Sequence, residues 1–173
     1  MASFSMIKKD HQFHVHDSDG IELADIHALQ ATHFEKGHAF VYTSRTDDQS
    51  IHVGIQKGRL IFADYLLQVA DRTFSLQDHK GKSLLYFAVS GVINGKNIYI
   101  EEDWDGHIEL KVEKEKIGLI MPYTFRKGAK IDIFNEADQD FYLPILSLFY
   151  FMFQIYKKES EFVEDLIEEA LDL

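Results

Sequence analysis

An uncharged run of 14 residues near the end of the chain, Leu143 to Tyr156, restricts the fold more than any other feature. A helix that is apolar on all sides has no face to present to water, so it must be buried. The preceding residues, 1–142, have the pattern of short β-strands. In a mostly-β chain of 173 residues, such a helix is most readily buried inside a barrel. We therefore predict a mainly-β fold, a closed β-barrel around a hydrophobic C-terminal α-helix.

Six turn dipeptides divide the region before this helix into short segments. Asn-Gly and Asp-Gly supply the residues with positive φ that tight hairpin turns require. Ile108 to Glu113 alternates apolar and polar residues, as a half-buried strand does. Many short strands at this spacing indicate a sandwich or a barrel. The dipeptides are Asp19-Gly20, Lys57-Gly58, Lys80-Gly81, Asn94-Gly95, Asp105-Gly106 and Lys127-Gly128.

Runs of β-branched and aromatic residues between these turns mark predicted strands. Examples are Phe40 to Tyr42, Leu60 to Phe62, Ser83 to Val89, Ile98 to Ile100 and Ile131 to Phe134. The stretch from Asp25 to Lys36 fits either a short helix or an irregular crossover.

The flanks of the uncharged run predict where its helix begins and ends. Asp138 and Asp140 are N-cap candidates, and Pro144 is expected within about the first turn, where its missing N–H is harmless. Lys157 and Lys158 close the run, near the negative end of the helix dipole. A second helix is therefore expected after Lys158.

The last residues, 159–173, repeat apolar positions at helical spacing between seven acidic residues. This pattern predicts an amphipathic helix that lays one face on the barrel or on a partner. Its acidity disfavours binding to a membrane surface. The predicted organisation is a barrel with its central helix over 1–158 and an acidic amphipathic C-terminal helix over 159–173.

The composition excludes several classes of function. A net charge of −11 repels phosphate backbones, so we expect no nucleic-acid binding. The chain has no cysteine, which excludes disulfides and thiolate chemistry. Its N-terminal residues carry charges where a signal peptide has an apolar segment, so we expect a cytoplasmic protein. The stretch from Phe141 to Tyr156 is shorter than the about 20 residues of a spanning helix, and we predict no membrane span.

Short strands followed by a buried apolar helix resemble the tubby C-terminal-domain-like superfamily, which includes the LURP-one-related proteins and the phospholipid scramblases. Tyr65 to Gly81 is similar to the family's opening pattern of a strand, a polar kink and an aromatic-led strand ending in an Asp/Gly turn. Ser83 to Glu113 continues with paired strands. Ile131 to Tyr156 resembles the family's last strand, acidic turn and threading helix. The likeness is best over residues 60–156 and looser before them.

The resemblance implies a barrel of about twelve antiparallel strands closed around a central helix. In tubby proteins, basic residues on the barrel wall hold phosphoinositides. No matching basic motif stands in this sequence, and its net charge has the opposite sign. The resemblance therefore supports the fold, while the charge disfavours a membrane lipid as the ligand.

Nine histidines raise the question of a metal site. His11, His14 and His16 cluster near the N-terminus, and the last two point to the same side of a strand. An H-x-H pair begins the metal motif of cupins, which needs a Glu about three to four residues later. Glu22 follows only beyond a turn, and no second cluster has a fitting spacing. We therefore predict exposed strand histidines, no metal and no cofactor.

Two Asp-x-Asp-Gly segments begin like calcium loops, at Asp17 and at Asp103. An EF-hand loop needs a Glu at its twelfth position, where Ala28 and Lys114 stand here. Both segments are therefore predicted to be hairpin turns. Trp104 lies at the tip of the second. We expect it to fold back on its own hairpin, and the alternative is that it anchors a partner.

Basic residues gather in two stretches near the last strands and are interleaved with acids or glycine. This pattern predicts a mixed, solvated face, with a phosphate-binding patch as the alternative if the fold brings the two stretches together. The residues are Lys111, Lys114, Lys116, Arg126, Lys127 and Lys130.

The sequence carries no nucleophile motif, P-loop or dinucleotide fingerprint, so it assigns no catalytic residue and leaves ligand-binding residues unknown. We expect a non-enzymatic tubby-like barrel that binds a protein or lipid partner, with residues 159–173 recruiting a protein. A barrel that encloses a small apolar ligand, as lipocalins do, is the alternative, although the helix at 143–156 would fill it. A His-metal enzyme on a β scaffold is the third hypothesis and lacks ligands.

Overall fold

The computed structural model describes residues 1–30, 34, 38–47, 49–57, 62–83 and 85–171, with only the backbone described at 57 and 163–171. Twelve strands are followed by the 3₁₀ turn η1 (Glu136–Asp138) and one helix, α1 (Gln139–Leu171). The strands are β1 (Ala2–Lys9), β2 (Gln12–His16), β3 (Glu22–Ala28), β4 (Ala39–Ser44), β5 (Ser50–Lys57), β6 (Asp64–Val69), β7 (Arg72–Asp78), β8 (Ala88–Ile93), β9 (Lys96–Glu102), β10 (Ile108–Val112), β11 (Glu115–Pro122) and β12 (Gly128–Ile133).

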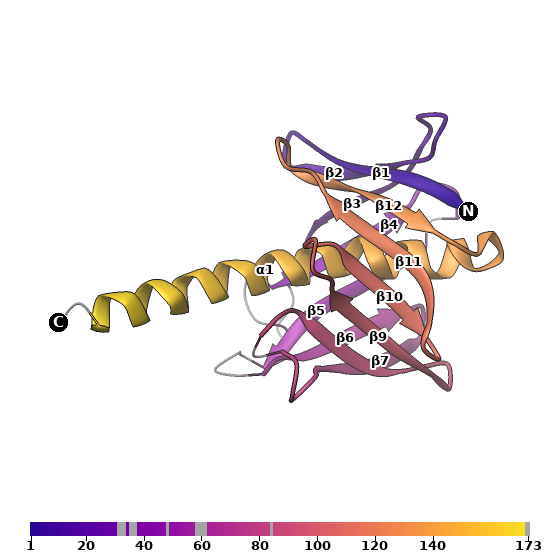
Figure 1. The fold of residues 1–173 in the computed structure, drawn as a ribbon. Coiled ribbons are helices and arrows are strands. Elements are labelled where there is room, and N and C mark those ends of the chain that lie inside the picture. Colours follow the sequence, from indigo (N-terminus) through magenta and orange to yellow (C-terminus); the bar gives the residue numbers. More distant parts are fainter. Residues whose placement is uncertain (31–33, 35–37, 48, 58–61, 84, 172–173) are drawn as a thin grey trace.

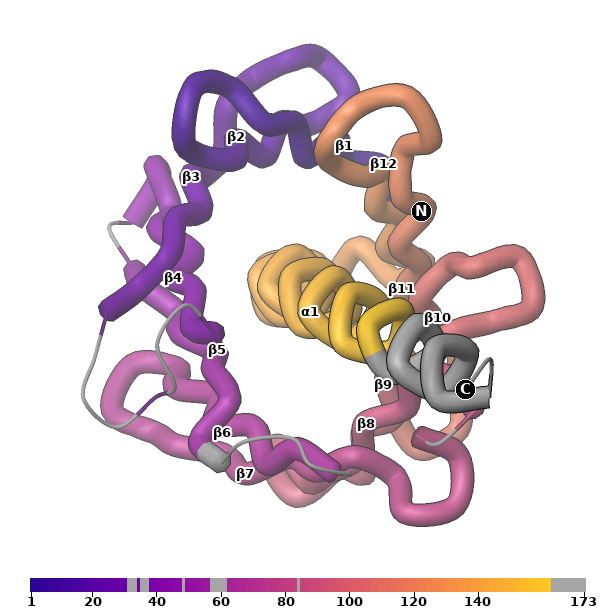
Figure 2. Tube along the Cα trace, turned by 90° about the vertical axis from the view of Figure 1, so that its left-hand side faces the viewer, coloured from indigo at the N-terminus to yellow at the C-terminus, as the bar shows by residue number. Residues whose placement is uncertain are grey.

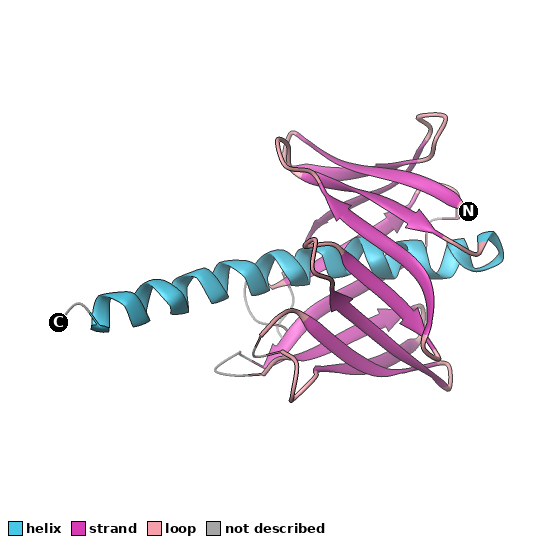
Figure 3. Cartoon of the chain, in the orientation of Figure 1, coloured by secondary structure: helices cyan, strands magenta, loops and turns pink. Residues whose placement is uncertain are grey.

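Each strand pairs antiparallel with the next along the chain, and β12 pairs with β1 to close the barrel. In the closing pair, Phe4 lies opposite Ile131. Closure leaves no unpaired sheet edge, which removes the usual site of edge-to-edge aggregation. The predicted mainly-β fold, a closed antiparallel barrel around a C-terminal helix, is confirmed (Figures 1 and 3).

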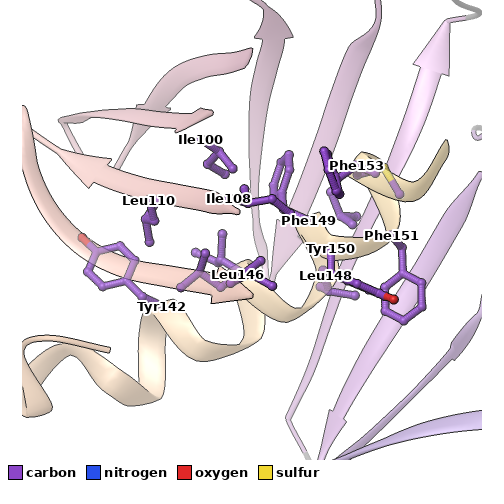
Figure 4. Close-up of a cluster of buried hydrophobic side chains, with 14 of the residues drawn as sticks. Ile100, Ile108, Leu110, Tyr142, Leu146, Leu148, Phe149, Tyr150, Phe151 and Phe153 are labelled. Atoms are coloured by element: carbon purple, nitrogen blue, oxygen red, sulfur yellow. The ribbon is translucent and has the colours of Figure 1, made fainter. Parts of the chain in front are cut away.

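The helix α1 runs along the inside of the barrel, and its uncharged residues form the centre of the core (Figures 2 and 4). Phe149 is fully buried, with its ring 5.8 Å from that of Tyr65. Phe151 stacks on Phe40 at 4.4 Å and meets the edge of Phe13 at 4.8 Å. The prediction that the uncharged run is buried inside a barrel is confirmed.

Several hairpin turns use positive φ, and only some of them contain glycine. Asn94 and Gly95, at φ 51° and 76°, form the two-residue turn between β8 and β9 that the sequence predicts. The β6–β7 turn instead places Ala70 at φ 54°, and the β10–β11 turn places both Glu113 and Lys114 at positive φ. Non-glycine residues rarely adopt this conformation, so sequence patterning missed these two turns.

Two predicted segments differ from the structure. Ser83 to Val89 was expected as a strand, but β8 begins only at Ala88. The described residues between β7 and β8 form turns in which the Lys82 N–H donates to the His79 carbonyl. The first part of the ambiguous segment from Asp25, up to Ala28, belongs to β3. Most of the rest of that segment, and of the predicted strand at 60–62, lies outside the described residues.

The ends of the helix also differ from expectation. Neither Asp138 nor Asp140 provides the cap: the Asn135 side chain caps η1 by accepting the Ala137 N–H, and α1 follows directly. Pro144 is therefore the sixth residue of α1 rather than part of its first turn. Lys157 does not end the helix either, because α1 continues without a break to Leu171.

Candidate interaction surface at the exit of the helix

The two ends of the barrel differ because the helix begins at one of them and leaves through the other. It begins beside the N-terminus, where the Met1 ammonium lies 3.0 Å from a Glu136 carboxylate oxygen. It then passes through the barrel and leaves at the opposite end (Figure 1). We call these the entry end and the exit end. Because the strands alternate in direction, the connections 79–87, 103–107 and 123–127 all lie at the exit end.

The exit end carries the most exposed large apolar side chains among the described residues. Trp104 is 105% exposed, Phe125 101% and Leu85 82%, and each comes from a different one of those three connections. Phe162, on α1 beyond the barrel, is 63% exposed. We call these four side chains the apolar rim. Several large apolar side chains exposed at one end of a barrel are a feature of interaction sites.

The position of Trp104 corrects the expectation that it folds back on its hairpin. The Asp103 carboxylate accepts the N–H groups of Asp105 and His107, both at 2.9 Å. Gly106 supplies the positive φ, at 75°. Since these backbone interactions hold the turn without help from the indole, Trp104 is left extended into solvent.

The connection with Phe125 is held in a similar way. The Arg126 guanidinium lies over the Tyr123 ring, 4.0 Å from its centre, and Phe125 between them is free of the barrel. Beneath this loop, a hollow reaches Tyr150 and Gln154 of α1. The Gly128 N–H donates to the Tyr150 hydroxyl at 3.2 Å, which ties the end of the loop to the helix.

The other two rim connections are also anchored to α1. Phe87, which ends the connection with Leu85, packs against Phe153 and Tyr156 with ring centres 5.6 Å apart in each pair. Lys157 lies 2.6 Å from a carboxylate oxygen of Glu102, directly before the turn with Trp104. The rim is therefore built on supports that fix its side chains relative to the emerging helix.

The predicted basic stretches separate in the structure. Lys111 pairs with Glu101 and Glu109, each at 2.8 Å, and Lys116 pairs with Glu109. Burial opposes ionisation of Glu101, but hydrogen bonds from Lys111 and Lys82 outweigh it and lower its pKa. These residues form the mixed, charged outer wall that the sequence predicts. Lys130 is likewise paired, with Asp132 at 3.0 Å, while Lys114 lies in a turn at the entry end.

Arg126 and Lys127 instead meet two lysines from the start of the chain. The Lys8 N–H donates to the Lys127 carbonyl at 3.3 Å, and Lys9 follows at the end of β1. No described carboxylate lies within 4.0 Å of these four side chains. They form a basic edge beside Phe125, which sequence spacing could not reveal because β1 and β12 meet only when the barrel closes.

His14 and His16 lie on the outer wall in β2, whereas His11 lies in the β1–β2 turn at the exit end. The Nδ1 of His14 is 3.0 Å from an oxygen of Glu22, because the β2–β3 hairpin folds that residue back beside it. Spacing along the sequence did not reveal this contact. Arg45 contacts the same oxygen at 2.8 Å, so Glu22 is already paired with a cation. Hydrogen bonding to His14 is the main cause of a lowered pKa of Glu22.

Both Asp-x-Asp-Gly segments form hairpin turns, as predicted. The Asp17 carboxylate accepts the N–H groups of Asp19 and Ile21 at 3.0 and 2.8 Å. In the second turn, ligand atoms of Asp103, Asp105 and His107 lie within 4.8 Å of one another, as in no other such group within the described part of the chain. The first of these carboxylates already accepts two backbone N–H groups, so hydrogen bonds within the turn account for this cluster.

Comparisons with family models, curated proteins and solved structures gave no match. In the part of the chain that the structure describes, no helix combines the length and the apolarity needed to cross a membrane.

Proposed function

We propose that this chain is a non-enzymatic, tubby-like barrel domain that binds a protein partner through the apolar rim at its exit end. The observation that carries the proposal is the exposure of Leu85, Trp104 and Phe125, which lie on three separate connections at the end of the barrel where α1 leaves it. The twelve-stranded barrel around a central helix is the architecture that the family resemblance implied, and it supports the assignment to that class.

The energetics favour a protein partner. Large aromatic side chains, tryptophan above all, contribute most of the binding energy at protein interfaces. Burial of apolar surface stabilises a complex by about 25 cal/mol per Å², and Trp104 and Phe125 have almost all their surface available. Their supports are already in place in the free protein, so binding requires little ordering of the connections.

The charged residues around the apolar rim indicate which kind of partner it would bind. The basic edge of Lys8, Lys9, Arg126 and Lys127 borders Phe125 and has no described acidic partner. A partner that offers apolar pockets with acidic residues beside them would complement this part of the rim. Glu159 and Glu161 precede Phe162 on α1 and add acidic residues to this part of the helix. This segment begins the 159–173 region expected to recruit a protein.

The alternative functions receive less support. The core around Phe149 is continuous from the barrel wall to the helix, which argues against a central chamber for an apolar cargo. Glu22, beside His14, is already paired with Arg45, which favours a structural role for these residues over a His-metal enzyme. A non-enzymatic role therefore remains the proposal that the geometry favours.

The test is a pull-down from the source cells with matched variants. The rim variant carries Trp104→Ser and Phe125→Ser, and the control carries Ile21→Ser and Val92→Ser, which remove exposed apolar side chains away from the exit end. We expect a protein that the wild type and the control retain and the rim variant loses. Reconstitution with that purified protein, measured by calorimetry, should then give saturable binding. Equal recovery by all three forms would contradict the proposal.

A vesicle-binding experiment distinguishes a protein partner from a lipid surface. Sedimentation with phosphoinositide-containing vesicles at physiological salt should show no binding by the wild type, because the acidic chain repels an anionic surface. Binding that fades with salt and is lost in an Arg126→Glu, Lys127→Glu variant would assign the exit end to lipid instead.

A further inference from the structure

A cavity of about 380 Å³ lies at the entry end, on the opposite side of the barrel from the apolar rim. The start of α1 forms one wall, and the ends of β3, β4 and β5 form the other. Volumes above about 300 Å³ are typical of sites for small molecules. The lining is divided between an apolar floor and a polar mouth, so the cavity can select its occupant by charge as well as by shape.

Tyr42 is the one buried residue with a polar side chain in the lining of this cavity. The residue is only 5% exposed, and its hydroxyl makes no hydrogen bond with a described group. Burial raises the pKa of Tyr42, and the nearby carboxylates of Asp47 and Asp140 raise it further. The phenol is therefore held neutral, as an unused donor and acceptor beneath two negative charges.

The two carboxylates come from different walls. Asp47 lies in the β4–β5 connection and Asp140 in the first turn of α1. Asp47 accepts the Gln49 N–H at 3.3 Å, and neither carboxylate has a cationic partner within 4.0 Å among the described side chains. The nearest basic residue in sequence, Arg45, is engaged by Glu22 at 2.8 Å. The mouth of the cavity therefore carries negative charge that no described cation within 4.0 Å neutralises.

The floor below these groups is apolar. It consists of Phe4, Leu23, Ile51, Leu143 and Pro144. An occupant of this cavity must therefore match an apolar surface at one end and two carboxylates at the other, and the carboxylates repel any anionic ligand.

We propose that the entry-end cavity binds a small organic ammonium with a compact apolar body. The ammonium would lie between Asp47 and Asp140, the Tyr42 hydroxyl would accept one of its protons, and the apolar body would rest on the floor. An ammonium has three donors, and the Tyr42 hydroxyl and the two carboxylates can each accept one of them. This inference is independent of the proposed partner binding at the exit end.

The test uses three probes of similar shape and different charge: 2-phenylethylammonium, the neutral 2-phenylethanol and the anionic 3-phenylpropionate. Two-dimensional amide NMR spectra of the full chain report binding and its location. We expect saturable shifts around Tyr42, Leu143 and Asp140 with the ammonium, and at least about fivefold weaker binding of the alcohol, because an exposed ion pair corresponds to about that factor. The carboxylate should not bind.

Matched variants locate the site. Asp47→Asn with Asp140→Asn should reduce ammonium affinity at least about fivefold, while Asp71→Asn, which removes the same charge from another entry-end turn, should leave it unchanged. Tyr42→Phe keeps the floor and removes only the hydroxyl, so it should weaken binding without changing the spectrum elsewhere. The rim variant should bind as the wild type does. Equal binding of ammonium and alcohol, or full affinity in the folded Asp47→Asn, Asp140→Asn variant, would overturn the proposal.

Discussion

Helix α1 is unbroken, but the part inside the barrel and the part beyond it have opposite surroundings (Figure 3). From Tyr142 to Phe153 every side chain is buried by the barrel. From Lys157 to Phe162 none is buried, and Phe162 is 63% exposed. The change occurs within about one turn, at Lys157, which pairs with Glu102 at the end of β9. We call these the inner and the outer stretch.

The difference shows that helix formation and helix burial have separate causes here. The inner stretch is stabilised by packing, since each large apolar side chain that is fully buried contributes about 1.5–3 kcal/mol. The outer stretch has no such packing at its described side chains and continues a helix whose nucleation has already occurred inside the barrel. Its apolar side chain is therefore free for a partner, whereas those of the inner stretch are committed to the fold.

The largest expected effect comes from a charge in the inner stretch. Phe149→Asp would bury an unpaired carboxylate at a fully buried position, which costs several kcal/mol against a total stability of about 5–15 kcal/mol. We expect an insoluble or unfolded protein, measured by the yield of soluble protein and by circular dichroism. Phe162→Asp, the same change in the outer stretch, should leave the melting temperature nearly unchanged. A soluble Phe149→Asp variant with the wild-type melting temperature would show that the inner stretch is dispensable.

A smaller effect is expected where the wall comes closest to the inner stretch. A Cβ at Gly118 of β11 would lie 2.5 Å from Cδ1 of Leu146. Gly118→Ala should therefore lower stability by about 1–3 kcal/mol in urea unfolding, the usual cost of overpacking. The second variant, Leu146→Ala, leaves a cavity, and the double variant should be less destabilised than the sum of the two single changes. Strict additivity would show that the two side chains do not share this space.

Much of the fold was predictable because it depends on residues that lie close together in the sequence. The uncharged run from Leu143 required burial, and the turn at Asn94 and Gly95 supplied positive φ from residues that favour it. The turns at Ala70 and Glu113 were missed because tertiary pairing of the strands imposes a conformation that those residue types do not favour.

The candidate surface was much less predictable. Trp104 was noticed in the sequence, but its exposure depends on the hydrogen bonds of Asp103, which hold the turn without it. Phe125 and the basic edge could not be found, because Lys8 and Lys127 are brought together only by closure of the barrel. Lys114 is separated from Arg126 and Lys127 because the β10–β11 turn lies at the opposite end of the barrel from the β11–β12 connection.

Alkaline pH should lower the stability of the protein through the buried tyrosines of the inner stretch, whereas the outer stretch, Lys157 to Phe162, has no tyrosine. Burial raises the pKa of Tyr142 and of Tyr150, both in the inner stretch, while the hydrogen bond from Gly128 opposes the shift at the latter. A phenol whose pKa is higher in the folded state keeps its proton there when the unfolded chain has lost it. Its contribution to stability is therefore fully present below the unfolded pKa of about 10 and is lost as the pH rises above that value.

We expect the free energy of unfolding to fall between pH 9 and pH 11 (about one unit on each side of that pKa), measured by urea titration at each pH. A Tyr142→Phe variant should show a shallower decline, because one of the groups that titrates has been removed. Lys158→Gln, a change of charge in the outer stretch, should leave the slope as it is. A stability that does not change over this range would contradict the burial of these hydroxyl groups.

The smallest effect concerns the one polar side chain that is fully buried in the inner stretch. Ser147 is 0% exposed, and its hydroxyl makes no hydrogen bond with any described group. A buried hydroxyl without a partner lowers stability by about 1–3 kcal/mol relative to a satisfied one, and alanine removes the hydroxyl at little cost in volume. Alanine also favours the helix more than serine does. Ser147→Ala should therefore unfold at an equal or slightly higher urea concentration, by up to about 1 kcal/mol. Ser160→Ala, in the outer stretch, should gain only the helix-propensity part of that increase. A clear loss of stability in Ser147→Ala would mean that the hydroxyl has a hydrogen-bond partner inside the barrel, and that the interior around α1 is less dry than its apolar lining implies.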